Sequence, residues 1–181
     1  MIKEIVRILN NGGTILYPTD TIWGIGCDAT NSEAISKIYT IKKREESKAL
    51  ISLVANKEHL SKYVSYIPKE AENKTPTTII YDNVNGLSRN LLAEDGTAAI
   101  RIVKDVFCRN LILAFGKAIV STSANISNET YPERYSEIEE SIINNVDYIV
   151  NLRKNQLMKT PSQILKVSKQ NLQIIRWEYM Q

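Results

Sequence analysis

Residues 14–26 of this chain read TILYPTDTIWGIG, an apolar stretch that changes into a hydroxyl-rich turn and then into a pair of glycines. The stretch from Thr14 to Tyr17 predicts a short buried strand, which Pro18 ends. Pro18 also fixes the backbone from which the following hydroxyl groups are aimed, and the glycines allow a ligand or a second backbone to approach closely. Ordinary turns use the same residue types, so this segment alone leaves both a binding site and a plain connection open.

Segments with helical periodicity lie on both sides of this stretch. On the N-terminal side, apolar residues recur at helical spacing from Ile2 to Leu9, and residues 11–13 (NGG) end that helix. On the C-terminal side, apolar residues from Ala34 to Ile41 predict a second helix, with an N-cap between Thr30 and Ser32.

Helices and strands continue to alternate along the rest of the chain. Asp105 to Phe115 is predicted to be a helix that Gly116 ends, and Ser136 with Glu139 forms a capping box for a helix reaching Ile143. This interleaving predicts an α/β fold, in which residues 1–181 form one domain with a twisted mixed sheet and flanking helices. The other predicted elements are a short helix at 57–64 and strands at 49–54, 77–81, 97–103, 117–120, 148–152, 163–167 and 172–177.

The composition is ordinary for a globular protein and argues against several classes. With 181 residues, 43% apolar and 24% charged, the chain fits one domain. A net charge of +3 is too small to indicate nucleic-acid binding by itself. Because no apolar run approaches the roughly 20 residues that cross a bilayer and no signal peptide is recognisable, we expect a cytoplasmic protein with no membrane partner. Cys27 and Cys108 lack metal-ligand spacing and are expected to be buried and reduced.

Several common catalytic motifs are missing from the sequence. Neither the Walker phosphate loop nor the full glycine pattern of dinucleotide-binding folds occurs. The single histidine, His59, lies in a polar stretch and is expected to be solvated, so a nucleophilic triad is not supported. An enzyme with this sequence is therefore expected to act by positioning and electrostatics, a style that suits nucleotidyl transfer.

A cluster of cations follows the helix that begins near Ser32. It consists of Lys42, Lys43 and Arg44, with Lys48 four residues further on. Cations at a helix C-terminus favour the macrodipole by about 0.3–1 kcal/mol and need no ligand for that. The alternative is a set of donors for a polyphosphate, in which Arg binds as a fork and Lys as a point charge.

A third segment, residues 121–127 (STSANIS), directly follows an apolar strand. Four hydroxyl groups and one amide crowd together at a place where α/β sheets often bind ligands. Capping or an Asx-type turn accounts for two of these groups, and a binding site accounts for all five.

Taken together, the three segments resemble those of the YrdC-like threonylcarbamoyl-AMP synthases in their single-domain bacterial form. The resemblance extends from about Gly12 to Arg176, and the joint order of its motifs is more specific than any one of them. It implies a YrdC-like fold with a concave, partly basic ligand-binding face. The motifs that carry it are Pro18-Thr19-Asp20-Thr21 leading into Gly24-Ile25-Gly26, the K-x-R of Lys42 and Arg44, and the S-x-N of Ser123 and Asn125.

The resemblance also implies a role for each matching residue. Arg101 is apt for the carboxylate of an amino acid, because a guanidinium group binds a carboxylate through two parallel hydrogen bonds. Lys42 is expected to face the phosphates or the carbamate. The implied threonine ligands are Thr21, Arg101, Ser123 and Ser162, the implied ATP ligands are Arg44, Lys48, Thr97, Asn125 and Arg176, and the implied catalytic residues are Lys42, Arg44, Ser123 and Asn125.

The reaction that the resemblance implies is a nucleotidyl transfer. L-threonine, bicarbonate and ATP would give threonylcarbamoyl-AMP and pyrophosphate, for the threonylcarbamoyl-adenosine modification of tRNA. ATP is then a substrate, Mg²⁺ is expected to arrive with it, and no metal bound by the protein itself is expected. Further expected partners are tRNA or double-stranded RNA and the proteins that transfer the threonylcarbamoyl group.

Two other functions remain compatible with the sequence. A YrdC-like module that binds double-stranded RNA or tRNA without catalysis needs only scattered Lys and Arg, although aimed hydroxyl groups favour chemistry. A carbamoyl-adenylate-forming domain, as in hydrogenase maturation proteins, would share the fold, but those proteins are much longer.

Overall fold

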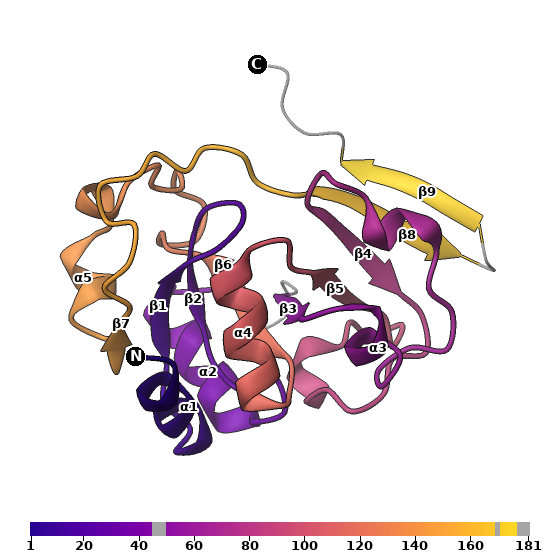
Figure 1. Cartoon of the computed structure of the whole chain (residues 1–181), viewed down its shortest axis with the longest axis horizontal. Coiled ribbons are helices and arrows are strands. Elements are labelled where there is room, and N and C mark those ends of the chain that lie inside the picture. Colours follow the sequence, from indigo (N-terminus) through magenta and orange to yellow (C-terminus); the bar gives the residue numbers. More distant parts are fainter. Residues whose placement is uncertain (45–49, 169–170, 177–181) are drawn as a thin grey trace.

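A twisted mixed sheet runs through the computed structural model, which describes residues 1–44, 50–168 and 171–176, apart from the side chains of Ser168 and Arg176 (Figure 1). The strand order is β7-β1-β2-β6-β3-β5-β4-β8-β9. Three pairs are parallel, namely β1 with β7, β3 with β5 and β4 with β8, and the other pairs are antiparallel. The strands are β1 (Ile15–Pro18), β2 (Trp23–Gly26), β3 (Ile51–Val54), β4 (Thr77–Tyr81), β5 (Ala98–Ile102), β6 (Ile119–Ser123), β7 (Tyr148–Ile149), β8 (Gln163–Ser168) and β9 (Asn171–Arg176).

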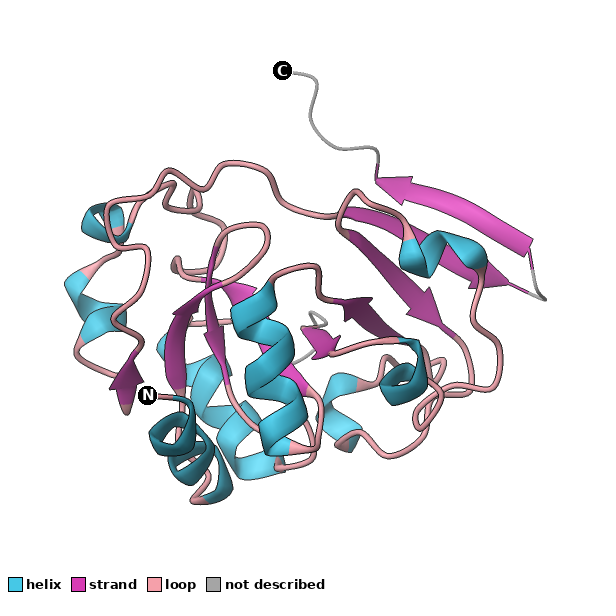
Figure 2. Cartoon of the chain, viewed as in Figure 1, coloured by secondary structure: helices cyan, strands magenta, loops and turns pink. Residues whose placement is uncertain are grey.

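Helices cover both faces of the sheet, which confirms the α/β prediction (Figure 2). The β8–β9 hairpin extends to one side, opposite the side that carries α5 and β7 (Figure 1). The helices are α1 (Ile2–Asn10), α2 (Ser32–Ile41), α3 (Lys57–Leu60), α4 (Val106–Phe115) and α5 (Glu140–Ile143), with 3-10 turns at Lys69–Glu72, Arg89–Leu91 and Tyr135–Glu137.

Side chains that alternate along the strands divide the core into two layers. On one face, α1 and α4 pack over residues such as Ile15, Leu53 and Ile119. On the other face, α2 packs over residues such as Leu16 and Val120. Because strand residues point to opposite faces in turn, each strand contributes to both layers and both layers are apolar.

The ends of α4 follow the local signals that the sequence carries. Asp105 caps the helix by accepting a hydrogen bond from the backbone N–H of Cys108 at 2.9 Å. Gly116 ends it in the left-handed region, at a φ of 81°. The prediction of this helix is therefore confirmed at both ends.

Two local predictions are wrong. His59 is only 5% exposed rather than solvated, because its Nδ1 accepts from the N–H of Ala55 and its ring packs on Tyr63. The capping box at Ser136 does not form, because Tyr135–Glu137 is a 3-10 turn and Glu139, which makes no side-chain cap, precedes α5.

Smaller differences concern element ends. The helix expected at 57–64 stops at Leu60, and the strand expected at 148–152 stops at Ile149. The strand expected at 117–120 instead begins at Ile119 and continues to Ser123, so that half of the hydroxyl-rich segment belongs to the sheet. The strand expected from residue 49 is described only from residue 50, and begins at Ile51.

Tyr17 and Gly26 fix the contact between β1, β2 and β6. The buried hydroxyl of Tyr17 donates a hydrogen bond to the backbone oxygen of Val120 at 3.1 Å. A Cβ atom at Gly26 would lie 2.4 Å from that oxygen and 2.7 Å from the Tyr17 ring, so glycine is required for the close approach.

The two cysteines and the helix lengths complete the description. Cys27 and Cys108 are buried free thiols, and burial raises the pKa of both. In the described part of the chain, no helix is long and apolar enough to cross a membrane.

Candidate functional site

A cavity of about 340 Å³ opens on the face of the sheet that carries α1 and α4. Ile51 lines the cavity and Leu53, two residues along the same strand face, lies in the core layer beneath the helices. The cavity therefore occupies the part of that face next to α4. Its lining residues come from distant parts of the chain: Thr21, Ile22, Trp23, Gly24, Arg44, Leu50, Ile51, Ile80, Ala99, Arg101, Ser121, Thr122, Ser123, Tyr131, Pro161, Ser162 and Ile164.

The turn between β1 and β2 forms one wall and is held by its own hydroxyl groups. The Thr19 hydroxyl donates to the backbone oxygen of Ile22 at 2.8 Å and accepts from the N–H of Thr21 at 3.1 Å. The two threonine hydroxyls are also 2.9 Å apart. These bonds fix the direction of the Thr21 side chain at the cavity.

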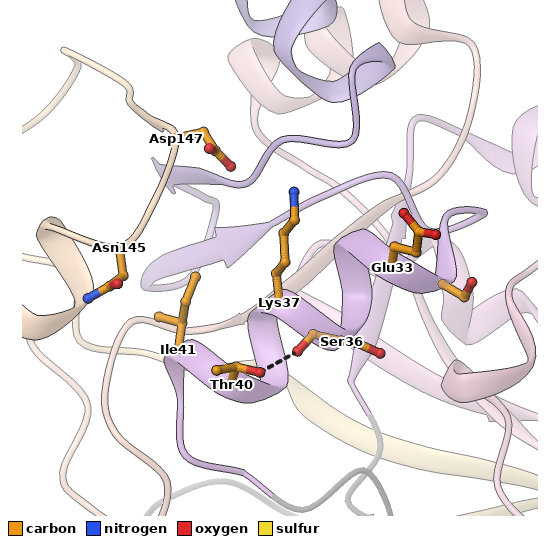
Figure 3. A pocket seen from close by; sticks show the side chains of 8 residues that line it. Glu33, Ser36, Lys37, Thr40, Ile41, Asn145 and Asp147 are labelled. Carbon is orange, nitrogen blue, oxygen red and sulfur yellow. Dashed lines mark hydrogen bonds between the residues drawn. The ribbon is translucent and has the colours of Figure 1, made fainter.

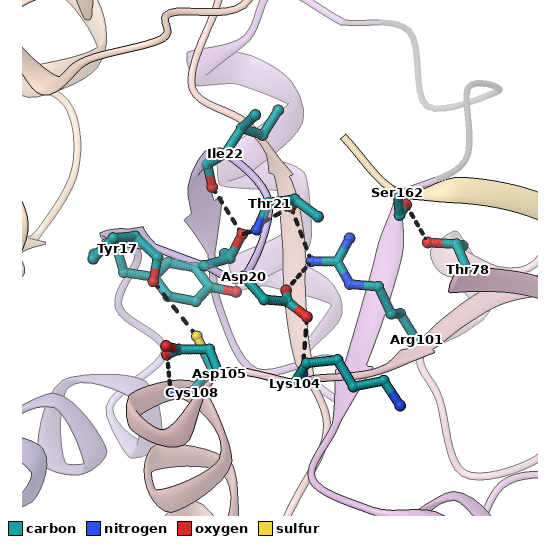
Figure 4. A network of polar contacts seen from close by, with 12 residues as sticks. Tyr17, Asp20, Thr21, Ile22, Thr78, Arg101, Lys104, Asp105, Cys108 and Ser162 are labelled. Atoms are coloured by element: carbon teal, nitrogen blue, oxygen red, sulfur yellow. Dashed lines mark hydrogen bonds and ion pairs between the residues drawn. The ribbon is translucent and has the colours of Figure 1, made fainter. Parts of the chain in front are cut away.

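A buried ion pair holds Arg101 in the same wall (Figure 4). One terminal nitrogen of Arg101 lies 2.9 Å from Asp20 Oδ1 and 3.2 Å from the Thr21 hydroxyl. The other oxygen of Asp20 accepts from the backbone N–H of Lys104 at 2.8 Å. Both charged side chains are at most 6% exposed. The Nε of Arg101 is buried and has no hydrogen-bond partner among the described residues, while Asp20 and Thr21 hold the terminal nitrogen.

Ser162, which directly precedes β8, meets Thr78 of the neighbouring strand β4. Their hydroxyl oxygens are 2.7 Å apart, and both side chains are buried. Thr78 pairs with Arg101 across β4 and β5, and also with Ile164 of β8. The sheet register therefore brings Ser162 close to Arg101 although 61 positions separate them in sequence.

Arg44 and Ser123 also line the cavity. Ser123 is the last residue of β6 and pairs with Gly24 of β2. Arg44 follows α2, and its backbone N–H donates to Tyr39 at 2.9 Å. Burial lowers the pKa of Arg44, but a guanidinium remains charged at neutral pH. Among the described residues, two cations thus line the cavity, Arg44 and Arg101.

Lys42 lies beside the cavity and not on it. Its side chain is 1% exposed, and its ammonium group donates to the backbone oxygens of Ser123 at 2.5 Å and Asn125 at 2.6 Å. Burial, with a smaller contribution from the Arg44 guanidinium, lowers the pKa of Lys42 to about 7. The structure therefore points this cation at the main chain, where a ligand contact was expected.

Two expected ATP ligands also make protein contacts outside the cavity lining. The side-chain amide of Asn125 donates to the backbone oxygen of Glu129 at 2.6 Å. The hydroxyl of Thr97 donates to Asp95 at 2.7 Å. Thr97 lies two residues before Ala99, so it shares the strand face that lines the cavity. Lys48 and the side chain of Arg176 lie outside the described residues.

Three residues of the site escaped the sequence analysis as site residues. Asp20 was quoted only as part of a motif, yet it holds Arg101. Thr78 supports Ser162, and a threonine inside a predicted strand gives no signal of that contact. Tyr131 lines the cavity and donates from its hydroxyl to the backbone oxygen of Lys159 at 2.9 Å.

A second hollow, of about 580 Å³, lies between α2 and the segment before β7 (Figure 3). Lys37 lines it and donates to the backbone oxygen of Gly12 at 3.1 Å. Thr40 lines it as well and donates to Ser36 within the helix. None of the residues singled out from the sequence lies on this hollow, so the smaller cavity is the candidate site.

In the described part of the chain, no three His, Cys, Asp or Glu side chains come together as a group that could hold a metal ion. The donors on the cavity are hydroxyls and guanidinium groups, which suit anionic and hydroxylated ligands.

Comparison with known proteins gives a consistent result. The family model for Sua5, YciO and YrdC proteins, described as telomere recombination, matches residues 7–177. A threonylcarbamoyl-AMP synthase of Psychromonas ingrahamii is 34% identical over 135 residues, which cover 70% of this chain and 71% of that protein. The enzyme of the same name from Halorhodospira halophila is 30% identical over 155 residues, covering 82% and 81%.

A solved structure supports the fold. Sua5 of P. abyssi, complexed with L-threonine, superposes with a TM-score of 0.85 at 23% identity over 97% of this chain. This chain spans about half the length of that protein, 53%.

Proposed function

Since the chain belongs to the Sua5/YciO/YrdC family, we propose that it is an L-threonylcarbamoyladenylate synthase, a nucleotidyltransferase that converts L-threonine, bicarbonate and ATP into threonylcarbamoyl-AMP and pyrophosphate. The shared name of its curated relatives confirms the catalytic interpretation of the sequence. The observation that carries the proposal is the meeting of Thr21, Arg44, Arg101, Ser123 and Ser162 on one cavity.

Threonine is proposed to bind at the Arg101 side of the cavity. Arg101 lines the cavity and its guanidinium group is held by the buried carboxylate of Asp20, which suits recognition of a carboxylate by its remaining donors. Thr21, Ser123 and Ser162 offer hydroxyl groups around it, apt for the amine and hydroxyl of the amino acid. The P. abyssi protein, which shares the fold, was solved in complex with L-threonine, and this supports threonine as a ligand of the proposed site.

ATP is proposed to bind at the Arg44 side. Arg44 is the cation on the cavity that has no assigned role in threonine binding. Thr97, Asn125, Lys48 and Arg176 are proposed to complete the ATP site. Mg²⁺ enters with the nucleotide as part of the substrate.

The chemistry then consists of two steps. The threonine amine attacks the carbon of bicarbonate-derived carbon dioxide and loses a proton, which gives an N-carboxylate. A carboxylate oxygen attacks the α-phosphorus of ATP, the bond to the bridging oxygen breaks, and pyrophosphate leaves. Both reactants of the second step are anions, so the positive charges of Arg44 and Arg101 on the cavity offset their repulsion. Ser123, which also lines the cavity, is proposed to orient the carbamate.

The further biological setting is proposed on the same basis. The product would serve the threonylcarbamoyl-adenosine modification of tRNA, with tRNA and the transferring proteins as partners, in the cytoplasm. We propose a single domain of residues 1–181, because one strand order joins all the described strands.

The test is an activity assay with the purified protein, repeated with each substrate left out in turn. The protein is incubated with ATP, L-threonine and bicarbonate, and pyrophosphate and the adenylate are both measured. Pyrophosphate that depends on all three substrates is expected. Nucleic-acid affinity that is independent of threonine, with no pyrophosphate, would favour the RNA-binding alternative instead.

A further inference from the structure

Lys42 contacts the segment after β6 through both ends of the residue. Its ammonium donates to the backbone oxygens of Ser123 and Asn125, at 2.5 and 2.6 Å. Its own backbone oxygen accepts from the N–H of Ser127 at 2.9 Å. One residue at the C-terminus of α2 therefore clamps residues 123–127, which we call the S-x-N loop.

The ammonium group has little capacity left for a ligand. Its third and weakest contact, at 3.5 Å, is the side-chain oxygen of Asn125, in the same loop. Among the described residues, no carboxylate forms an ion pair with Lys42. The side chain is 1% exposed and does not line the cavity. All three donors of the cation are thus directed at the S-x-N loop.

Burial also makes this lysine a poor anchor for phosphate. It lowers the pKa of Lys42 to about 7, so a fraction of the side chains is neutral at physiological pH. A neutral amine keeps two N–H donors, which is the number that the two main-chain oxygens require. The clamp therefore survives loss of the charge, whereas a charge contact to phosphate would not.

Among the described residues, few other backbone hydrogen bonds hold the S-x-N loop. Sheet pairing ends at Ser123, and the next backbone bond runs from the N–H of Ala124 to Trp23 at 3.0 Å. Asn125 then bonds to Glu129, which lies further along the same connection. Between Ala124 and Ser127, Lys42 supplies the bonds that tie the loop to another part of the fold.

We propose that Lys42 is a positioning residue, which holds the S-x-N loop in the geometry needed for Ser123 and Asn125 to meet the substrates, while Arg44 is the member of the K-x-R motif that contacts phosphate. The positioning part rests on the proposed function, because it concerns the same site. The loop-holding part does not depend on any reaction.

The experiment compares Lys42→Met with Lys43→Met. The two variants lose the same charge one position apart, but Lys43 is exposed. Hydrogen exchange of the Ala124 and Ser127 amides is measured without nucleotide, and pyrophosphate turnover is measured at saturating ATP and threonine. Folding of both variants is checked by circular dichroism.

We expect exchange of the two amides to accelerate by about tenfold or more in Lys42→Met and to stay at the wild-type rate in Lys43→Met. Turnover should fall by about tenfold or more in Lys42→Met alone, since small misplacements of substrate-positioning groups cost large factors in rate. Unchanged exchange in nucleotide-free Lys42→Met would overturn the proposal whatever the activity. Faster exchange with wild-type turnover would overturn the positioning role.

A measurement on the wild-type protein covers the case in which Lys42→Met does not fold. The side-chain nitrogen of Lys42 is observed by NMR with and without an ATP analogue. We expect its protons to be protected without nucleotide and its resonance to move less than that of the Arg44 Nε when nucleotide is added; an equal or larger movement would contradict the proposal. If the wild type makes no pyrophosphate, the proposed function fails, and the exchange and NMR results still decide whether Lys42 holds the loop.

Discussion

The site has one buried cation on the cavity and another beside it, and the protein holds the two in different ways. On the Arg101 side, formed by residues 19–22 and Arg101, the guanidinium faces the carboxylate of Asp20 at 2.9 Å and lines the cavity. On the Lys42 side, formed by the end of α2 and the S-x-N loop, the ammonium faces main-chain oxygens and does not reach the cavity. Burial alone therefore does not identify a ligand-binding cation; the partner and the remaining donors do.

The difference has an energetic basis. A buried cation paired with a carboxylate keeps its charge in place, and the guanidinium has donors beyond those that the pair uses. A buried ammonium bonded to carbonyls is solvated by the protein but not neutralised, which favours a lowered pKa. The carboxylate-paired guanidinium of Arg101 therefore suits recognition of an anion. The carbonyl-bonded ammonium of Lys42 suits holding a main-chain segment in place.

The largest effect is expected for Arg101→Ala. The variant leaves Asp20 buried without its cation, which costs about 3–5 kcal/mol of unfolding free energy. It should also raise the KM for threonine about 100-fold and change the KM for ATP much less, because the lost donors serve the carboxylate. Urea unfolding and pyrophosphate kinetics measure the two effects.

A double variant separates the effect on stability from the effect on threonine binding. Asp20→Asn combined with Arg101→Ala removes the unpaired charge, so much of the stability should return while the threonine KM stays high. An equal rise in both KM values would count against the carboxylate role of Arg101.

Arg44→Ala tests the other cation on the cavity and should have a smaller effect. We expect the KM for ATP to rise about tenfold, the loss of roughly one charge-assisted contact, with a change in unfolding free energy of no more than about 1 kcal/mol. Arg109→Ala, on the exposed surface of α4, is the control. Wild-type activity of Arg44→Ala at limiting ATP would show that the assignment is wrong.

The Lys42 side should differ from the Arg101 side in its response to pH. The pKa of Lys42 is about 7 in the folded protein and 10.5 as an ordinary value, so between these values the unfolded chain binds more protons. The unfolding free energy of the wild type, relative to Lys42→Met, should therefore rise with pH from about 7, by at most about 1.4 kcal/mol per pH unit. Denaturant titrations at pH 7, 8 and 9 measure this slope. If the difference in unfolding free energy between the wild type and Lys42→Met does not change with pH, the Lys42 ammonium keeps its proton over this range, stabilised by its bonds to the carbonyl oxygens.

The smallest effect is expected for Thr78→Val, which removes the hydroxyl that supports Ser162 and keeps the shape. Loss of this bond should cost about 1 kcal/mol of unfolding free energy and raise the threonine KM by about threefold. Thr40→Val removes an exposed hydroxyl from α2 as the control. A selective rise in the KM for ATP would place Ser162 on the nucleotide side.

The sequence predicted elements best where local chemistry sets their ends. Asp105 and Gly116 bound α4 because a cap and a left-handed residue act within one turn. His59 was placed wrongly because its burial depends on Tyr63 and Ala55 in the folded chain, which its polar sequence neighbours conceal. The capping box at Ser136 failed because a 3-10 turn takes its place.

The same division applies to the site. Thr21, Arg101 and Ser123 were picked out through motifs, and the structure brings them to one cavity. The direction of Lys42 was not predictable, because its partners are main-chain oxygens, which every residue carries and no motif marks. The contact of Thr78 with Ser162 depends on the register of β4 and β8, which the sequence does not state.

The packing of Tyr17 on Gly26 constrains how this sequence can vary. The phenol bridges to Val120, and the space under it is smaller than one methyl group. Neither position can be exchanged by itself: a side chain at residue 26 displaces the ring, and a smaller residue at 17 leaves a void beneath α4. Across homologous sequences, position 26 should then stay glycine even where position 17 carries a shorter side chain, because the backbone oxygen of Val120 alone leaves no space for a Cβ atom there.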